Sequence, residues 1–375
     1  MNNSTDYLNN STDYLNNSTD YLYLYPFSYD YITPNPKHIL PPPFQGYVET
    51  IFTVVYVIIM VFALSGNTLV ILVILGNKSL RNVTNMFLIS LAISDILISG
   101  FNVPMNLLYN FDMVWNYGEA MCKIVSYTTA VNVVASIMTL TAVALERYYA
   151  ICHPLKIRYL KTNTRVVVVM CVVWVLALAV SSPFLFIQEM SIRLQELNEP
   201  PGLRIVEVCV EQYRQRELLE AHTLIQFIIF YCGPIGVMFF AYGKIAHQLW
   251  IRKPIGDSHD LEKTMQQKKK IIKMLIVIVL MFVLCWFPFF SVHVYRLYND
   301  VDYNDYRLVS LIVKVIGFTN SAVNPIIYGF MNQKFKQTIR LMYIRCRSKL
   351  CRGKNVSVHS QSNSAPNSLT AESVV

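Results

Sequence analysis

The sequence predicts an all-α membrane protein in which seven helices cross the bilayer as one bundle. Apolar residues make up 54% of the 375 residues and charged residues only 15%, a more apolar composition than a soluble domain of this length has. Seven apolar runs follow one another, each near the roughly 20 residues that a helix needs to cross a hydrocarbon core of about 30 Å. They are too long and too continuously apolar for the strands of a membrane barrel.

The predicted spans, with ends placed to about 2–4 residues, lie at 47–75, 86–109, 122–151, 166–187, 222–250, 270–296 and 308–330. Basic residues indicate their orientation, because cytoplasmic loops are enriched in Lys and Arg. With the amino terminus outside, 22 of the 32 Lys and Arg residues fall on the cytoplasmic side and 9 on the outer side, whereas 17 of the 23 acids fall outside. We therefore expect a multi-pass protein of the plasma membrane with an extracellular amino terminus and a cytoplasmic carboxyl terminus. The net charge of +9 indicates this topology and anionic inner lipid, with no nucleic-acid partner.

The amino-terminal segment 1–46 is expected to be a disordered outer tail. It contains NNSTDYL three times, at 2–8, 9–15 and 16–22, with too few apolar residues for a coiled coil. No basic start followed by an apolar core precedes residue 45, so we expect the first span to direct insertion. The Asn-x-Ser/Thr pattern marks candidate glycosylation sites at Asn2, Asn3, Asn9, Asn10, Asn16 and Asn17.

After the seven-helix domain 47–331, the segment 332–346 is expected to form an amphipathic helix on the membrane surface. Apolar residues from Phe335 to Ile344 interleave there with Lys and Arg. Cys346 and Cys351 are candidate palmitoylation sites, with ordinary free thiols as the alternative. The tail 347–375 is polar and Ser-rich, hence disordered, and its last four residues Glu372 to Val375 resemble a ligand for PDZ domains.

An acid and a base stand together at the end of the third span. No residue from Ile124 to Leu145 carries a charge, and then Glu146 and Arg147 follow in LERYYAICHP. An interfacial anchor is one interpretation of this pair, and a functional pair is the other.

Asp95 lies in the middle of the second span, where a carboxylate costs about 2.5–3.5 kcal/mol on insertion scales. It should therefore face polar partners from other spans. Oxygen ligands around one carboxylate suit a small cation, so we predict an allosteric Na⁺ site. The expected ligands are Asp95, Ser136, Asn320, Ser321 and Asn324.

Further signatures occur in the other spans: Gly66-Asn67, Trp174, Pro234, Tyr242, CWFP at 285–288 and NPIIY at 324–328. Together with the features above, they resemble the rhodopsin-like (class A) G-protein-coupled receptors over residues 45 to 346. The resemblance implies a receptor, not an enzyme, that binds a ligand outside and promotes nucleotide exchange on a heterotrimeric G protein inside. It also implies receptor kinases and arrestin as partners of the Ser-rich tail.

The resemblance assigns roles to the polar residues. Glu146 would hold Arg147 at rest, and Tyr242 and Tyr328 would approach Arg147 after the sixth helix moves outward. One departure is that Lys268, Lys269 and Lys270 stand where many relatives have an acid, so we do not expect a cross-helix ionic lock and we expect appreciable basal activity. The other switch residues implied are Phe282, Trp286, Pro288, Asn324 and Pro325.

The resemblance also implies a disulfide between Cys122 and Cys209, which pins the long second outer loop. Alternating residues on both sides of NEPPG in this loop predict a β-hairpin, which is typical of the family's peptide receptors.

The ligand is expected to be a peptide. Amine receptors have an Asp at the position of Thr129, and light-sensing opsins have their Schiff-base Lys at the position of Phe318, with Lys314 one turn higher. The local sequence resembles receptors for RFamide-type peptides, neuropeptide FF, orexin and neuropeptide Y, and the acidic outer face suits a cationic, C-terminally amidated neuropeptide. The candidate contacts are Asn106, Thr129, Glu211, Gln226, Trp286, Phe290, His293 and Lys314.

The alternatives are a class A receptor for a non-peptide ligand, an opsin, which Phe318 disfavours, and a channel or transporter. The sequence has no Gly/Pro-broken inverted repeat and no charged pore ring, which argues against transport. It also has no nucleophile paired with a base and no metal cluster of the kinds that enzymes use, and no cofactor is expected besides Na⁺.

Overall fold

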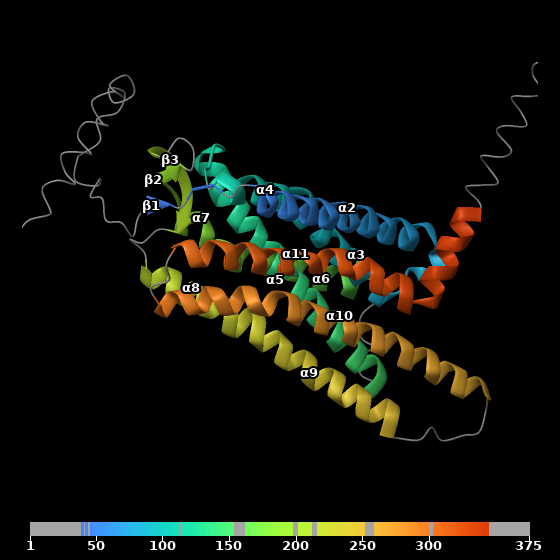
Figure 1. Ribbon diagram of the computed structural model, residues 1–375. Helices are drawn as coiled ribbons and strands as arrows, with labels where there is room; N and C mark the ends of the chain where they lie inside the picture. Colours follow the sequence, from blue (N-terminus) through green and yellow to red (C-terminus); the bar gives the residue numbers. More distant parts are fainter. Residues whose placement is uncertain are drawn as a thin grey trace, which may run out of the picture. The chain divides into compact units, whose positions relative to one another are not determined.

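The computed structural model describes residues 39–40, 42–43, 46–112, 114–153, 162–197, 202–211, 216–251, 259–299 and 303–344. The expected glycosylation sites, Cys346, Cys351 and the carboxyl-terminal tail lie outside these residues. Within them, seven helical segments are long and apolar enough to cross a membrane. The predicted seven-helix bundle is therefore confirmed (Figure 1).

The helices succeed one another with short interruptions. They comprise α2 (Tyr47–Gly76), the 3₁₀ turn η3 (Lys78–Leu80), α3 (Val83–Leu97), η4 (Ile98–Asn102), α4 (Val103–Asp112), α5 (Gly118–Cys152), α6 (Thr162–Ser181), α7 (Phe184–Ile187), α8 (Arg216–Phe227), η7 (Ile228–Cys232), α9 (Gly233–Ala246), η8 (His247–Ile251), α10 (His259–Tyr298) and α11 (Tyr303–Met331). Several helices run past the predicted spans. For example, α10 begins at His259 because its polar first turns continue the helix beyond the apolar run.

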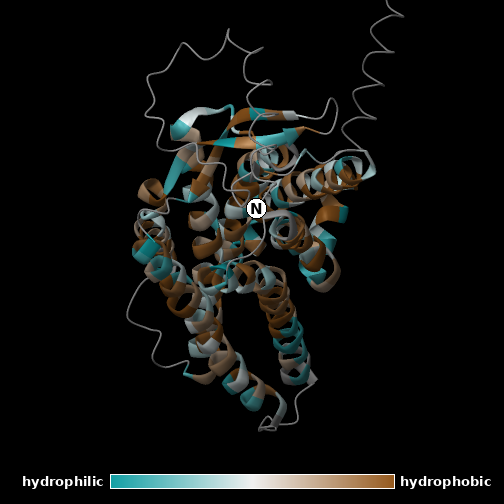
Figure 2. Cartoon of the chain, turned by 60° about the vertical axis from the view of Figure 1, so that its left-hand side comes forward, coloured by the Kyte–Doolittle hydropathy of each residue, from teal (hydrophilic) through white to brown (hydrophobic). Residues whose placement is uncertain are grey.

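The seven spans bury different shares of their length. The α5 span is 72% buried over its most apolar window, whereas the α2 span is 33% buried, so α5 is central and α2 peripheral. Large apolar side chains such as Phe239 and Phe330 are exposed on outward faces. The helices carry long brown stretches in Figure 2, as expected for helices with apolar residues toward lipid as well as toward the core.

The bundle core depends on a close approach between the first and seventh spans. A Cβ atom placed on Gly66 of α2 would lie 2.8 Å from both Cβ and Cγ of Pro325 in α11. Real Cβ atoms do not come this close to other carbons, so only glycine permits the contact. The Gly66-Asn67 signature thus has a packing role as well as a polar one, because Asn67 Nδ2 donates to the carbonyl oxygen of Ser321 at 2.9 Å.

Two π-helical segments, η4 and η7, interrupt spans that were predicted as regular helices, and a third, η8, ends the fifth span. In η4 and η7 the backbone inserts an extra residue into the turn, which rotates the following side chains. Asn102, at the end of η4, is fully buried. Its Nδ2 lies 2.8 Å from the hydroxyl oxygens of both Thr128 and Thr129 in α5.

A β-hairpin covers the end of the bundle where α5 begins, which we call the hairpin end. Strands β2 (Gln188–Leu197) and β3 (Gly202–Glu211) pair antiparallel, with Leu197 opposite Gly202, so the paired strands flank the NEPPG segment as predicted. The Cys122–Cys209 disulfide ties β3 to the second turn of α5. Both predictions are confirmed. Both edges of the hairpin have partners, which protects them from pairing with other chains. Strand β1 (Ile39–Leu40) lies beside β2, and on β3 the Glu207 carbonyl accepts from the Trp115 N–H at 2.7 Å.

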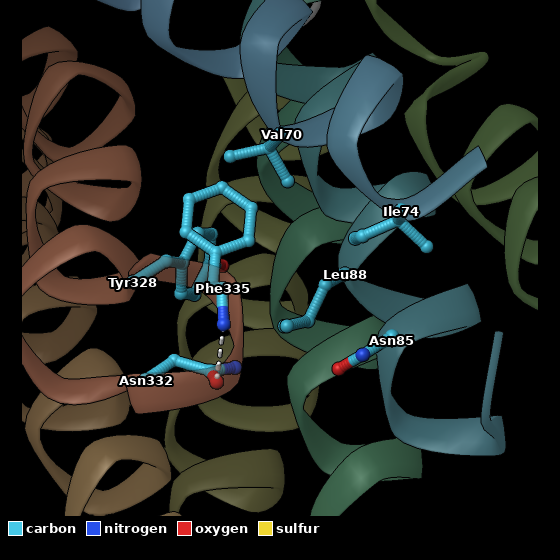
Figure 3. Close-up of a pocket in the computed structure, with 7 residues that line it drawn as sticks. All are labelled: Val70, Ile74, Asn85, Leu88, Tyr328, Asn332 and Phe335. Atoms are coloured by element: carbon cyan, nitrogen blue, oxygen red, sulfur yellow. Dashed lines mark hydrogen bonds between the residues drawn. The ribbon is translucent and has the colours of Figure 1, made fainter. Parts of the chain in front are cut away.

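A short helix, 333–344, follows α11 at the opposite end and turns away from it (Figure 1). The side-chain oxygen of Asn332 accepts from the Phe335 N–H at 3.1 Å, which starts the helix with a cap. Phe335 is buried in a crevice that Val70, Leu88 and Tyr328 also line (Figure 3). The predicted carboxyl-terminal helix is therefore present, anchored to the bundle by Phe335 and by the Thr338 hydroxyl, which accepts from Asn77 Nδ2 at 3.1 Å.

Candidate functional site

At the end of α5, Glu146 forms an ion pair with Arg165 and also interacts electrostatically with Arg147. The Glu146 Oε1 atom accepts a hydrogen bond from Arg165 Nη2 of α6 at 2.8 Å. Arg147 Nε is buried with no hydrogen-bond partner among the described residues. Adjacent residues on a helix do not face each other, so Glu146 serves a neighbour on another helix. Arg165 is not among the predicted site residues, and no local pattern in the sequence marks it.

Two tyrosines share the core with Arg147. Tyr242 of α9 and Tyr328 of α11 are buried, and neither hydroxyl has a hydrogen-bond partner among the described residues. Tyr242 lies close enough to Arg147 for electrostatic interaction. The switch roles expected for these residues stay predictions. The two tyrosine hydroxyls and Arg147 Nε are buried, and none of them has a hydrogen-bond partner among the described residues.

Asp95 of α3 lies in a polar cluster in the middle of the bundle. Its Oδ2 atom accepts from Asn324 Nδ2 of α11 at 2.8 Å. Ser136 of α5 and two further residues of α11, Asn320 and Ser321, are buried as well. The bundle thus buries all five expected Na⁺ ligands.

The donor set fits Na⁺. The side-chain oxygens of Asn320 and Asn324 are buried and accept no hydrogen bond from any described residue. These oxygens, the Asp95 carboxylate and the two serine hydroxyls are the hard ligands that such a cation prefers. Within the described part of the chain, no three His, Cys, Asp or Glu side chains group as metal ligands. A site of one carboxylate with neutral oxygens is therefore the best match for the residues present.

Trp286 of α10 lies at the centre of an aromatic layer. Its ring centroid is 6.3 Å from that of Phe282 and 6.5 Å from that of Phe318. A Cβ on Gly317 would lie 3.2 to 3.4 Å from three carbons of the Trp286 ring. Phe318 is buried and also contacts Tyr56 edge-on. The position at which an opsin has its lysine is therefore filled by an aromatic core residue.

Above this layer, aromatic and polar side chains from α8, η7 and α10 meet. Phe290 lies against Tyr231, with ring centroids 4.6 Å apart. Gln226 and His222 lie one turn apart on α8, both buried, with Gln226 Nε2 and His222 Nδ1 lacking hydrogen-bond partners among the described residues. Sequence analysis found Gln226 but missed His222, although their four-residue spacing places both on one helix face.

At the hairpin end, charged residues gather around Glu211 of β3. Arg296 Nη1 of α10 lies 3.8 Å from Glu211 Oε2. The Arg296 guanidinium also lies over the Tyr306 ring, 4.0 Å from its centroid, and donates to the Tyr306 hydroxyl at 2.9 Å. His293 and Lys314 interact electrostatically with Glu211. The structure thus brings three of the expected ligand contacts together and adds Arg296, which sequence analysis missed.

The other expected contacts fall into two further groups. Asn106 Nδ2 donates to the Asn102 carbonyl at 2.9 Å, and Thr129 lies 2.8 Å from Asn102 Nδ2. Trp286 and Phe290 both contact Phe289 edge-on. Asn102 therefore connects α4 and α5 on one side of the bundle, while aromatic residues form the other group.

Comparison with known proteins identifies this arrangement. Residues 66–328, which include every expected switch residue, match the family of the 7 transmembrane receptor (rhodopsin family). The chain belongs to this family. It is a class A G-protein-coupled receptor, a multi-pass membrane protein that signals through G proteins and is not an enzyme.

The receptor is similar to several peptide receptors. It is 34% identical over 316 residues to the QRFP-like peptide receptor of Branchiostoma floridae, covering 83% of this chain and 82% of the relative. It is 34% identical over 308 residues to the Pyroglutamylated RF-amide peptide receptor of Mus musculus, covering 79% and 70%. It is 30% identical over 317 residues to the Neuropeptide FF receptor 2 of Mus musculus, covering 81% and 75%.

Proposed function

We propose that this receptor binds an RFamide-type neuropeptide, a cationic peptide with an amidated carboxyl terminus, at its hairpin end and activates heterotrimeric G proteins at the other. The names of the RF-amide and neuropeptide FF receptors to which the chain is similar support this ligand class. The basic loops support an orientation with the hairpin outside the cell.

The observation that carries the proposal is the placement of Glu211. The disulfide at Cys209, two residues earlier, fixes β3 to α5 and so fixes the height of this carboxylate over the bundle. The Glu211 side chain is 24% exposed, and its contact with Arg296 at 3.8 Å is too long for a direct hydrogen bond. An ionised carboxylate has about four acceptor sites, so Glu211 retains capacity for a ligand guanidinium.

The aromatic layer below Glu211 suits the residue that follows the arginine. Phe290, Phe289 and Trp286 of α10 present ring faces and edges to one another at centroid distances of 5.5 and 5.7 Å. An aromatic ligand side chain binds such rings in an offset or edge-on arrangement. In this proposal the ligand places its arginine at Glu211 and its terminal aromatic residue toward Phe290.

The experiment begins with a screen of amidated neuropeptides on cells that carry calcium and cyclic-AMP reporters. The active peptide and its citrulline analogue, which keeps the shape and removes the charge, are then compared on wild type and Glu211→Gln. Loss of one partner of such a pair costs about 2–5 kcal/mol when buried and under about 1 kcal/mol when exposed. For the partly exposed Glu211, we expect a potency loss of about tenfold or more, with little discrimination left between the two peptides.

Glu207→Gln is the matched control, because Glu207 is an exposed carboxylate on the same strand. Its potency should stay within about twofold of wild type, as expected for an exposed charge. Independent, additive losses from Glu211→Gln and citrulline would show that Glu211 is not the partner of the arginine. Activity confined to non-amidated or non-peptide ligands would contradict the ligand class itself.

The remaining partners belong to the same proposal. Receptor kinases and arrestin would bind the Ser-rich tail 347–375, and a PDZ domain would capture the terminal Glu372 to Val375, by adding this extended peptide to a sheet edge. Both segments lie outside the described residues.

A further inference from the structure

Glu146, the acid next to Arg147 in the sequence, forms an ion pair with Arg165. The Glu146 carboxylate of α5 receives the Arg165 guanidinium of α6 at 2.8 Å, and the two side chains are only 15% and 21% exposed. A charge-assisted hydrogen bond at this distance is strong, and partial burial protects it from screening by salt. The bond therefore fixes the direction in which Glu146 points.

Among the described residues Arg147 forms no ion pair of this kind, and Glu146 acts on it only electrostatically, from beyond ion-pair distance. The Arg147 Nε atom is buried without a hydrogen bond, and no carboxylate of the described residues lies within ion-pair distance of it. On α10, the positions at which many relatives have an acid are occupied by Lys268, Lys269 and Lys270. Lys269 Nζ lies 5.6 Å from the centroid of the Trp250 ring. Glu146 is thus the nearest acid along the chain to Arg147, and it is turned toward another helix.

The two arginines compete for one carboxylate. Glu146 and Arg147 are adjacent on a helix, so the side chain must rotate to serve Arg147, and this rotation gives up the bond with Arg165. Whatever weakens Arg165 as a partner therefore strengthens the restraint on Arg147.

We propose that Arg165 is a positioning residue of the signalling site, which holds Glu146 away from Arg147 and thereby sets a high rate of agonist-independent nucleotide exchange. The inference goes beyond the proposed ligand and does not depend on it, because it concerns the receptor without agonist. Arg165 acts through Glu146 and does not itself contact the G protein.

The test measures agonist-independent binding of a non-hydrolysable GTP analogue to purified heterotrimeric G proteins of the inhibitory, stimulatory and phospholipase-activating classes. The full-length receptor is placed in nanodiscs of phosphatidylcholine and phosphatidylglycerol, and rates are normalised to correctly folded receptor. Arg165→Gln releases Glu146 to Arg147, so the basal rate should fall about fivefold, which corresponds to about 1 kcal/mol of coupling. Arg165→Lys, which keeps the charge, should recover much of the wild-type rate.

Glu146→Gln breaks the same bond by changing the other partner. It distinguishes the release of Glu146 toward Arg147 from the loss of a purely structural tie between α5 and α6. It removes the acid that could restrain Arg147, so the basal rate should stay at or above wild type. The double variant Glu146→Gln/Arg165→Gln should behave like Glu146→Gln alone, because Arg165 has no carboxylate left to position. Lys123→Gln, which removes an exposed ion pair elsewhere on α5, is the matched control and should leave the rate unchanged.

Three results would overturn the proposal. An equal fall in both single variants would make the bond a purely structural tie between α5 and α6. An unchanged or raised basal rate in Arg165→Gln would show that Arg165 and Arg147 do not compete for Glu146. A wild-type receptor whose basal exchange does not exceed that of empty nanodiscs with every G protein would show that Arg147 is restrained by other means.

Discussion

At the scale of single residues, the bundle buries polar atoms that lower the free energy of unfolding, so their presence needs a reason other than stability. Asp95 is buried and accepts a hydrogen bond from Asn324, and two amide oxygens of α11 have no partner among the described residues. Buried polar groups without partners cost roughly 1–3 kcal/mol each. A cation that binds all of these oxygens at once would offset this cost, which is the physical case for Na⁺.

We therefore predict that Asp95→Asn removes sodium sensitivity. Na⁺ should raise the apparent melting temperature of the wild-type receptor in detergent relative to choline at equal ionic strength, because a ligand that binds only the folded state stabilises it. Na⁺ should also lower agonist affinity, with a coupling of about 1–3 kcal/mol. Both effects should vanish in Asp95→Asn, and an equal sodium response of the two proteins would place the site elsewhere.

At the scale of elements, helices approach where one of them has no side chain. Gly66 of α2 accepts the ring of Pro325, and Gly317 of α11 accepts the ring of Trp286. The contact of Gly66 with Pro325 sets the distance between α2 and α11. The contact of Gly317 with Trp286 sets the space available to the tryptophan ring. Pro325 and Pro288 lie inside α11 and α10, where each removes a helical hydrogen bond and permits a bend.

Substitution of Gly66 by Ala should destabilise the receptor. The added methyl group would overlap Pro325, and overpacking of this kind typically costs about 1–3 kcal/mol. The measurement is the apparent melting temperature of the purified receptor. Gly236→Ala is the matched control on α9, because a Cβ there meets nothing within 4 Å, and it should be neutral or slightly stabilising. Equal melting temperatures of Gly66→Ala and wild type would contradict the packing assignment.

At the scale of the whole molecule, charge and hydropathy are organised along the membrane normal. Acids concentrate in the segments on one side of the seven spans and Lys and Arg in those on the other. The hairpin, the disulfide and the Glu211 cluster share the end where α5 begins, and Arg147 lies near the other end of the same helix. Ligand and G protein are thus expected on opposite sides of one continuous helix.

This arrangement predicts glycosylation of the NNSTDYL repeats outside the cell. The receptor expressed in mammalian cells should shift to a lower apparent mass after glycosidase treatment. Replacement of the six repeat asparagines by Gln should abolish that shift while an amino-terminal tag stays accessible on intact cells. A tag that is accessible only after permeabilisation would reverse the orientation.

Features that depend on local composition could be predicted from the sequence alone. Run length and hydropathy identified the seven spans, because any apolar run of that length in lipid must form a helix, and NEPPG identified the hairpin turn. The motif resemblance, which is also readable along the chain, identified the family and the Cys122–Cys209 disulfide.

Which side chains meet across helices follows from the three-dimensional packing. The packing gives Glu146 an ion-pair partner in Arg165, places Arg296 at Glu211, and rotates Asn102 toward α5 through a π-helical turn that no hydropathy pattern indicates. Such contacts depend on helix rotation and crossing, and a rotation of one residue moves a side chain by about 100° around its helix. Spacing along one helix cannot specify the face of its neighbour, so these partners follow from packing alone.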